Sequence, residues 1–149
     1  MSAKTSMDVF LVFDGNCREA IEFYATVFKQ EMPKQIMTYG EAPEEPSDPN
    51  PETDGSPLVN ENRDRIIYAS MPLFGQNVMF CDCPTGQEHI KGNNISLTLG
   101  LSDEAEMKRI FEALANGGEV YMPLSKTFFS ELFGMVCDKF SIIWQLSRI

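Results

Sequence analysis

The fold is decided by one stretch of the sequence, Phe13-Asp14-Gly15-Asn16-Cys17-Arg18-Glu19-Ala20-Ile21-Glu22-Phe23-Tyr24, in which an apolar strand leads through a polar turn into an amphipathic helix. The same order recurs at residues 99–111. A chain that runs strand, helix and strands, and then repeats that order, predicts two fused βαβββ modules. We therefore expect an α+β fold in which two half-barrels build a cleft.

The first module is expected over about residues 7–83. Its opening strand, residues 8–13, has few polar positions, which predicts burial on both faces. Asn16 is the expected N-cap and Glu19 occupies the position of a capping-box partner, so a helix is predicted to run to about Phe28. The other expected strands are 34–39 and a hairpin of 65–73 and 76–81.

A long insert, residues 40–62, interrupts the first module. It holds five of the nine prolines and seven Asp or Glu residues without a Lys or Arg. Such a segment has too little apolar surface to offset the entropy lost on ordering. We expect it to be the least ordered or most exposed part of the chain.

The second module is expected over about residues 93–149, after a polar connector at 85–93. Its opening strand, 95–101, alternates apolar with small polar residues, so one face should pack on a helix and the other should line the cleft. Ser102 or Asp103 is the expected N-cap of that helix, and Gly117-Gly118 ends it. Its apolar stripe is Met107, Ile110, Phe111 and Leu114, and the last strands are expected near 119–122, 132–137 and 142–146. The length favours a single domain, residues 1–149.

The charge and the distribution of apolar residues disfavour two classes of binding partner, nucleic acids and membranes. The net charge of −10 disfavours binding to nucleic acid or to an anionic membrane surface. The sequence has no apolar run of about 18 residues and no apolar stretch near its start, so we expect no membrane span and no signal peptide, and we predict a cytoplasmic protein.

The four cysteines, Cys17, Cys81, Cys83 and Cys137, lack the C-x-x-C spacing of redox and zinc sites. We expect reduced core thiols, with metal binding or oxidation of the closely spaced Cys81 and Cys83 as the alternative. His89, the only histidine, is expected to be a solvated residue of the connector, because one His cannot build a zinc or iron site without further ligands. No Ser-His-Asp or Cys-His arrangement suited to nucleophilic catalysis is evident.

Three motifs carry a family resemblance. They are Asp14-Gly15-Asn16-Cys17-x-Glu19-Ala20-Ile21-x-Phe23-Tyr24-x-x-x-Phe28, then Met79-Phe80-Cys81-Asp82, then Thr127-Phe128-Phe129-x-x-x-Phe133-Gly134-Met135-Val136-x-Asp138-Lys139-Phe140 with Trp144. They resemble the PhnB-like branch of the glyoxalase, bleomycin-resistance and extradiol-dioxygenase (vicinal oxygen chelate) superfamily. The resemblance covers about residues 8–146 and implies a homodimer of paired βαβββ modules with a cleft in each half-barrel.

Metal-dependent members of this superfamily place His and Glu ligands on the opening strand of each module and on the last strand, where a divalent ion polarises a substrate oxygen or holds dioxygen. Carried over, these positions fall on Asp8 or Val9, near Asn94, and on Gln145. Many relatives also have a His in the third strand, where this chain has Tyr68. The ligand set is missing, so we expect no metal ion and no other cofactor.

Aromatic side chains with a few polar neighbours suit a pocket for a small, partly apolar ligand, although they can equally well fill the half-barrels. The candidate residues are Tyr68, Met79, Ser96, Thr98, Phe128, Phe129, Phe133, Trp144 and Gln145. The leading hypothesis is a metal-free dimeric protein that binds a small organic molecule without turning it over. The alternative is an enzyme, either a metal-dependent lyase or dioxygenase with atypical ligands or a methyltransferase. The chain has no glycine-rich nucleotide-binding loop of the kind expected for S-adenosylmethionine.

Overall fold

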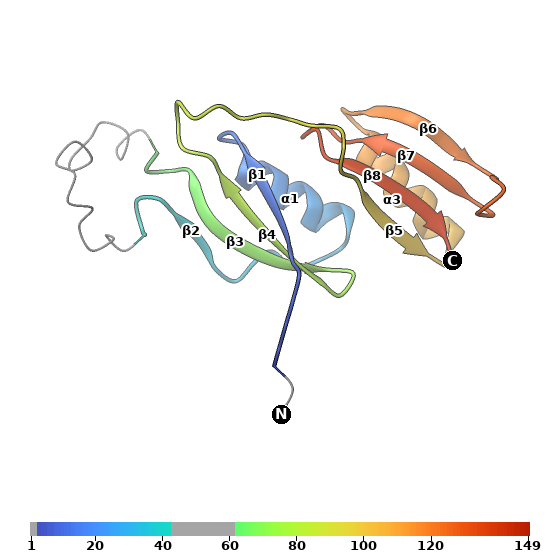
Figure 1. Cartoon of the computed structure of the whole chain (residues 1–149), viewed down its shortest axis with the longest axis horizontal. Coiled ribbons are helices and arrows are strands. Elements are labelled where there is room, and N and C mark those ends of the chain that lie inside the picture. Colours follow the sequence, from blue (N-terminus) through green and yellow to red (C-terminus); the bar gives the residue numbers. More distant parts are fainter. Residues whose placement is uncertain (1–2, 43–61) are drawn as a thin grey trace. The chain divides into compact units, whose positions relative to one another are not determined.

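The computed structural model describes residues 3–42 and 62–149. These residues belong to two compact units, Met1–His89 and Ile90–Ile149, so the boundary lies inside the predicted connector. In its described part each unit has one four-stranded sheet and one helix (Figure 1). The predicted α+β class is confirmed.

The first unit contains the elements of one βαβββ module: β1 (Val9–Phe13), α1 (Cys17–Val27), β2 (Ile36–Thr38), β3 (Ile66–Leu73) and β4 (Gln76–Asp82). The strand order is β1-β4-β3-β2, with β1 parallel to β4 and the other pairs antiparallel. The predicted hairpin is present, and both residues of its turn, Phe74 and Gly75, have positive φ, as a two-residue turn that matches the strand twist requires.

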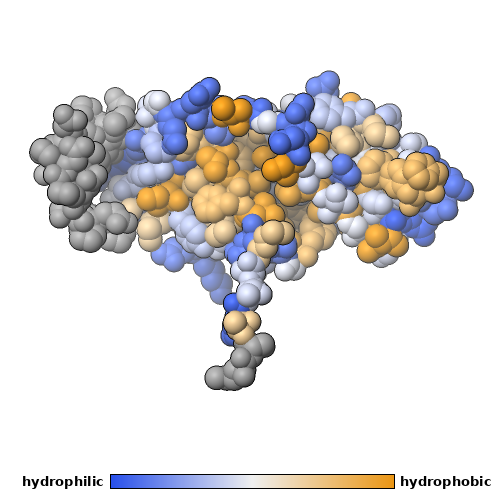
Figure 2. All heavy atoms as spheres, viewed as in Figure 1, coloured by the Kyte–Doolittle hydropathy of each residue, from blue (hydrophilic) through white to orange (hydrophobic). Residues whose placement is uncertain are grey.

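The prediction that the opening strand is buried on both faces is wrong. Leu11 and Phe13 are buried on the side of α1, whereas Phe10 and Val12 are 46% and 43% exposed. Side chains alternate along β1, so Phe10 and Val12 lie on the side of the sheet that α1 does not cover, together with Met79, the partner of Phe10 in the register. Figure 2 shows hydrophobic residues gathered over this open side of the first sheet.

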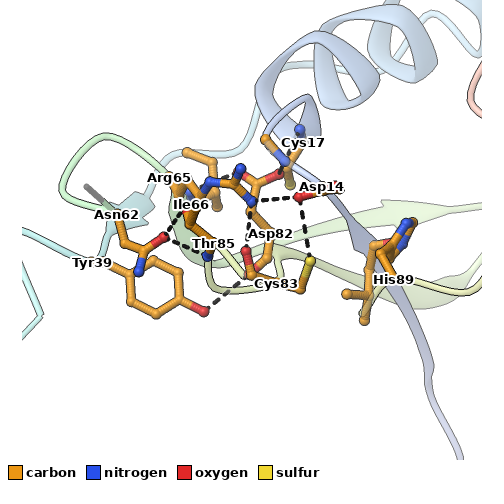
Figure 3. Close-up of polar contacts among 12 residues, drawn as sticks. Asp14, Cys17, Tyr39, Asn62, Arg65, Ile66, Asp82, Cys83, Thr85 and His89 are labelled. Atoms are coloured by element: carbon orange, nitrogen blue, oxygen red, sulfur yellow. Dashed lines mark hydrogen bonds and ion pairs between the residues drawn. The ribbon is translucent and has the colours of Figure 1, made fainter. Parts of the chain in front are cut away.

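The start of α1 is capped from a distant strand rather than locally. Asn16 is the N-cap residue, but its side chain makes no capping hydrogen bond, so the predicted capping box is not formed. Instead, Oδ1 of Asp82 accepts hydrogen bonds from the backbone nitrogens of Gly15 (2.7 Å) and Cys17 (3.0 Å), and Oδ2 accepts from the nitrogen of Ile66 (2.9 Å) (Figure 3). A buried carboxylate at the end of β4 therefore ties the helix start to β3.

An ion pair lies beside this capping carboxylate. Nη1 of Arg65 donates to Oδ1 of Asp14 and to the carbonyl of Cys83, at 2.8 Å each (Figure 3). The hydrogen bond from Arg65 holds the pKa of Asp14 below its ordinary value. Nearby, Asn62 is buried and its Oδ1 accepts from the nitrogen and the hydroxyl of Thr85. The prediction for the acidic insert lies almost wholly outside the described residues, because only its ends, 40–42 and 62, are described.

The second unit repeats the topology with β5 (Leu97–Leu101), α3 (Glu104–Ala115), β6 (Glu119–Ser125), β7 (Phe133–Cys137) and β8 (Ile143–Arg148). The strand order β5-β8-β7-β6 again places the first strand parallel to the last. Asp103 caps α3 by accepting from the nitrogens of Ala105 and Glu106, and all four predicted stripe residues of the helix are buried. Gly134 faces α3 so closely that a Cβ there would lie 2.8 Å from the Phe111 ring.

All four cysteines are free thiols in the structure. Cys17 and Cys83 are buried, whereas Cys81 and Cys137 are half-buried. Burial raises the pKa of Cys17, Cys81 and Cys83, which keeps these thiols protonated and poorly reactive. Within the described part of the chain no helix is both long and apolar enough to cross a membrane.

Candidate functional site

A hollow of about 340 Å³ lies on the sheet of the second unit. Its walls come from the segment before β5 and from strands β6, β7 and β8. The side chains that line it are Asn93, Asn94, Ile95, Ser96, Tyr121, Met135, Ile143 and Gln145. Such a volume suits a small organic molecule rather than a polymer.

The strand register explains why these residues share one face. Gln145 of β8 lies between Thr98 of β5 and Met135 of β7 in the register. Gly134, the neighbour of Met135, faces α3, so Met135 and its partners face the opposite, open side. On that side Nε2 of Gln145 donates to Oγ of Ser96 at 3.0 Å. The open side of the second sheet therefore carries hydrogen-bonding groups above an apolar floor.

Tyr121 and Cys137 form a second polar pair beside the hollow. A hydrogen-bonding interaction with the Cys137 side chain is the main reason why the pKa of Tyr121 lies above its ordinary value. The nearby carboxylate of Glu119 acts in the same direction. Tyr121 is thus a neutral phenol at physiological pH, and it contributes a hydroxyl and an aromatic ring to the hollow.

The predicted candidate residues separate into several environments. Ser96 and Gln145 line the hollow of the second unit, and Thr98 is exposed beside Gln145 on the same face. Phe133 is buried, with the Phe129 ring 4.9 Å from its own between centroids. The remaining members of the group in this unit do not line the hollow.

Trp144 lies in the core, 2% exposed, and its Nε1 donates to Oδ2 of Asp138 at 2.8 Å. At the opposite extreme, Phe128 is 99% exposed and Phe129 is 57% exposed. The predicted aromatic group is therefore divided among the core, the surface and the open face of the sheet.

Two candidates belong to the first unit. Tyr68 lines a separate hollow of about 360 Å³ together with Ser70, Pro72 and the segment 30–35, which follows α1. Met79 is half-buried on the open side of the first sheet and does not line that hollow. Unlike the hollow of the second unit, this one has charged residues in its wall, namely Glu31 and Lys34.

The sequence missed Asn93, Ile95, Tyr121, Met135 and Ile143 as parts of a site. The expectation that Ile95 packs on the helix is wrong, because it precedes β5 and its side chain is exposed at the hollow. Met135 and Ile143 alternate with helix-facing neighbours, so the strand period of two carries the signal that could have found them. Tyr121 lies at a register shift between β6 and β7, and no local sequence pattern predicts such a shift.

The residues at the superfamily's metal positions do not fit a transition-metal ion. Asn94 and Gln145 line the hollow of the second unit, but they offer neutral carboxamides where metal-dependent members offer His and Glu. Asp8 is exposed and accepts a hydrogen bond from Ser6 in the first unit. Among the described residues no three His, Cys, Asp or Glu side chains are grouped so as to hold a metal ion.

His89 has a partner in the backbone. Its Nε2 lies 2.8 Å from the carbonyl oxygen of Val12 in β1. The side chain is half-buried rather than fully solvated, so the expectation of a solvated His is wrong in this detail. The contact fastens the connector to β1.

A family model described as 3-demethylubiquinone-9 3-methyltransferase matches residues 5–147. The chain belongs to this family. Protein YjdN of Escherichia coli is 31% identical over 142 residues, which cover 94% of this chain and 92% of YjdN. A putative 3-demethylubiquinone-9 3-methyltransferase, the PhnB protein of Bacillus cereus, is 28% identical with a TM-score of 0.76 over 97% of this chain and 100% of its own. The predicted PhnB-like resemblance is confirmed.

The fold extends to more distant proteins. The fosfomycin resistance protein FosX of Listeria monocytogenes superposes with a TM-score of 0.60 over 98% of this chain and 94% of its own, at 11% identity. At that identity the likeness concerns the fold alone, and it confirms the predicted glyoxalase and bleomycin-resistance type of fold.

Proposed function

We propose that this protein binds a small organic molecule in the hollow of the second unit, without a metal ion and without chemical conversion. The observation that carries the proposal is the hollow itself, which combines an apolar floor with hydrogen-bonding side chains of Ser96, Tyr121 and Gln145. Apolar walls with a few placed polar groups are the usual composition of a small-molecule site.

The proposal of metal independence rests on donor chemistry. Carboxamides are weak ligands for first-row transition metals, which prefer imidazole, thiolate and carboxylate. Asn94 and Gln145 therefore favour recognition of an organic group over coordination of an ion. A lyase or dioxygenase of the superfamily's metal-dependent type would need ligands that these positions do not supply.

The family description makes methyl transfer the second candidate. That reaction requires a site for S-adenosylmethionine, whose sulfonium is cationic and whose carboxylate is anionic. The hollow of the second unit offers neither a cation nor an anion in its walls. Titration with S-adenosylmethionine, followed by calorimetry, separates the two functions, because the binding proposal expects no heat of binding.

We also propose a homodimer. Strand β6 is an edge strand of the described sheet, and Val120, Tyr121 and Met122 on it are 40–46% exposed. Phe128 and Phe129 expose further aromatic surface in the same unit. Edge strands and exposed apolar side chains are commonly covered by a partner. Light scattering should give twice the mass of the chain, and a monomer throughout the micromolar range would contradict the proposal.

The test of the function begins with protein purified without chelator. Native mass spectrometry should find a bound small molecule, and elemental analysis should find no stoichiometric transition metal. The variant Met135→Trp, which fills the hollow, should lose the molecule, whereas the control Lys108→Trp, at an exposed position of α3 outside the lining, should keep it.

One transition-metal ion per chain would refute the metal-free proposal. Equal retention of the small molecule by both variants would refute the placement in the hollow. We further expect the protein in the cytoplasmic fraction and without affinity for nucleic acid, which fractionation and filter binding measure directly.

A further inference from the structure

The hollow of the second unit is polar without being charged. Asn93, Asn94 and Gln145 contribute carboxamides, Ser96 and Tyr121 contribute hydroxyls, and no Lys, Arg, Asp, Glu or His stands among its lining residues in the described part of the chain. Carboxamides and hydroxyls both donate and accept hydrogen bonds, whereas charged side chains do only one of these. The lining is therefore complementary to a ligand group that does both.

Gln145 shows this capacity most clearly. Its Nε2 donates to Ser96, and no described residue donates to its Oε1. The side chain is half-buried among Met135 and Ile143, so a ligand group reaching it leaves part of its water shell behind. A lone amide oxygen in such surroundings favours a partner that can donate a hydrogen bond.

We infer that this hollow selects an uncharged ligand bearing a primary amide or a similar donor and acceptor group, and that it rejects carboxylates, phosphates and phosphonates. The inference rests on the proposed function, since it names the ligand class of the same hollow.

Electrostatics support the rejection of anions. An anion that enters a half-buried site needs a cation or several directed N–H groups to replace its lost hydration. Among the described residues the hollow has no cation in its walls, Nε2 of Gln145 already donates to Ser96, and Asn93 and Asn94 are exposed, so no set of buried N–H groups is free for an anion. The charge that acts on Tyr121 from nearby is the carboxylate of Glu119. This negative charge adds repulsion to the cost of dehydration.

The experiment uses three probes of equal size and shape: benzamide, which is neutral, benzoate, which is anionic, and benzamidinium, which is cationic. The full chain carries ¹³C-labelled methyl groups at Met and Ile, and signals of Met135 and Ile143 report occupation of the hollow. We expect benzamide to shift both signals with titration, and we expect dissociation constants at least about tenfold higher for benzoate and for benzamidinium.

A charge introduced into the lining should reverse the preference. Gln145→Glu replaces the amide by a carboxylate of the same size, so benzamidinium should then bind more tightly than benzamide. The control Gln87→Glu adds the same charge at an exposed position outside the lining and should keep the wild-type order. Circular dichroism shows whether each variant is folded. If Gln145→Glu does not fold, the titrations of the wild type with the three probes decide the question by themselves.

The outcomes separate the two proposals. Benzoate that binds less than tenfold more weakly than benzamide overturns the inference but leaves small-molecule binding in place. Benzamidinium that binds less than tenfold more weakly than benzamide to the wild type also overturns it, because Glu119 would then define an acidic site. If no probe shifts the signals of Met135 and Ile143, the hollow takes no such ligand, and the proposed function fails together with the inference.

Discussion

Replacing Asp82 by Asn should destabilise the first unit strongly, although the side chain keeps its size. Oδ1 accepts from the nitrogens of Gly15 and Cys17, Oδ2 accepts from the nitrogen of Ile66, and the residue is only 2% exposed. Every one of these partners is a donor. Because Asn has one oxygen and one NH₂ group, either orientation of its amide turns a donor towards at least one backbone N–H.

The magnitude follows from hydrogen-bond energetics. A buried N–H that loses its acceptor costs about 1–3 kcal/mol, and bonds to a charged group contribute about 1.5–3 kcal/mol against about 0.5–1.5 kcal/mol for typical ones. Losing one acceptor and neutralising the other should together lower the free energy of unfolding by about 2–4 kcal/mol. For a chain of this length, such a loss lowers Tm by roughly 4–16 °C.

Urea unfolding followed by circular dichroism measures the effect as a shift of the midpoint at unchanged slope. The matched control is Asp103→Asn at the start of α3. There a single oxygen, Oδ1, accepts from both Ala105 and Glu106, so an Asn side chain keeps both bonds and caps as well as Asp. We expect this variant to lie within about 0.5 kcal/mol of the wild type. A loss for Asp82→Asn no larger than that of Asp103→Asn would refute the reasoning.

Three further predictions follow from the packing and the electrostatics. Gly134→Ala should lower the free energy of unfolding by about 1–3 kcal/mol, because its Cβ would lie 2.8 Å from an aromatic ring of α3. The control Gly92→Ala, whose Cβ would contact no carbon atom, should leave the stability unchanged. Coinciding urea unfolding curves of the two variants would contradict this prediction. Cys17 should resist iodoacetamide in the folded protein at pH 8 and react after unfolding, because burial raises its pKa; mass spectrometry measures the labelling, and rapid reaction of the folded protein would exclude the buried thiol. Arg65 lowers the pKa of Asp14, so the ion pair of these residues stabilises the folded protein above the unfolded pKa of about 3.9, and this stabilisation is lost as the pH falls through the lower folded value. Arg65→Gln should therefore raise the titration midpoint of the Asp14 carboxyl, measured by NMR. An unchanged midpoint would rule out the ion pair as the cause of the lowered pKa.

Features that depend only on neighbouring residues, such as the apolar stripe and the N-cap of α3, were predicted correctly. The period of the second helix placed four apolar residues on one face, and all four are buried. Asp103, one of two candidate caps, is the N-cap residue because its short carboxylate reaches the first free backbone nitrogens of the helix. Both features depend on residues within one or two helical turns, so composition and spacing suffice to predict them.

Features that depend on distant residues were not predicted. The cap of α1 comes from Asp82, 65 residues after Cys17, and it replaces the local pair of Asn16 and Glu19. Nothing in the helix sequence announces this partner, because the contact exists only once β1 and β4 have paired. The exposed face of β1 has the same origin, since the single helix in the described part of this unit covers only one side of the sheet.

The candidate site residues separate for a related reason, because the sequence analysis did not apply the alternation of side chains along β8. Trp144 and Gln145 were both proposed for the cleft, yet they are consecutive residues of β8. Successive side chains of a strand point to opposite faces, so the two could not line one hollow. Trp144 faces the core, where Asp138 accepts its N–H, and Gln145 faces the hollow. Selecting residues by aromatic character ignored this alternation, and applying it would have kept Gln145 and removed Trp144.

The same alternation explains how two modules of one topology can differ in chemistry. Positions that face α1 or α3 must be apolar, because their burial holds each unit together. Positions on the open sides escape that requirement: Phe10 and Met79 are apolar positions of the first side, whereas Ser96 and Gln145 are hydrogen-bonding positions of the second. The repeated sequence pattern thus specifies the fold twice, and the residues between the pattern positions determine what the hollow of the second unit can bind.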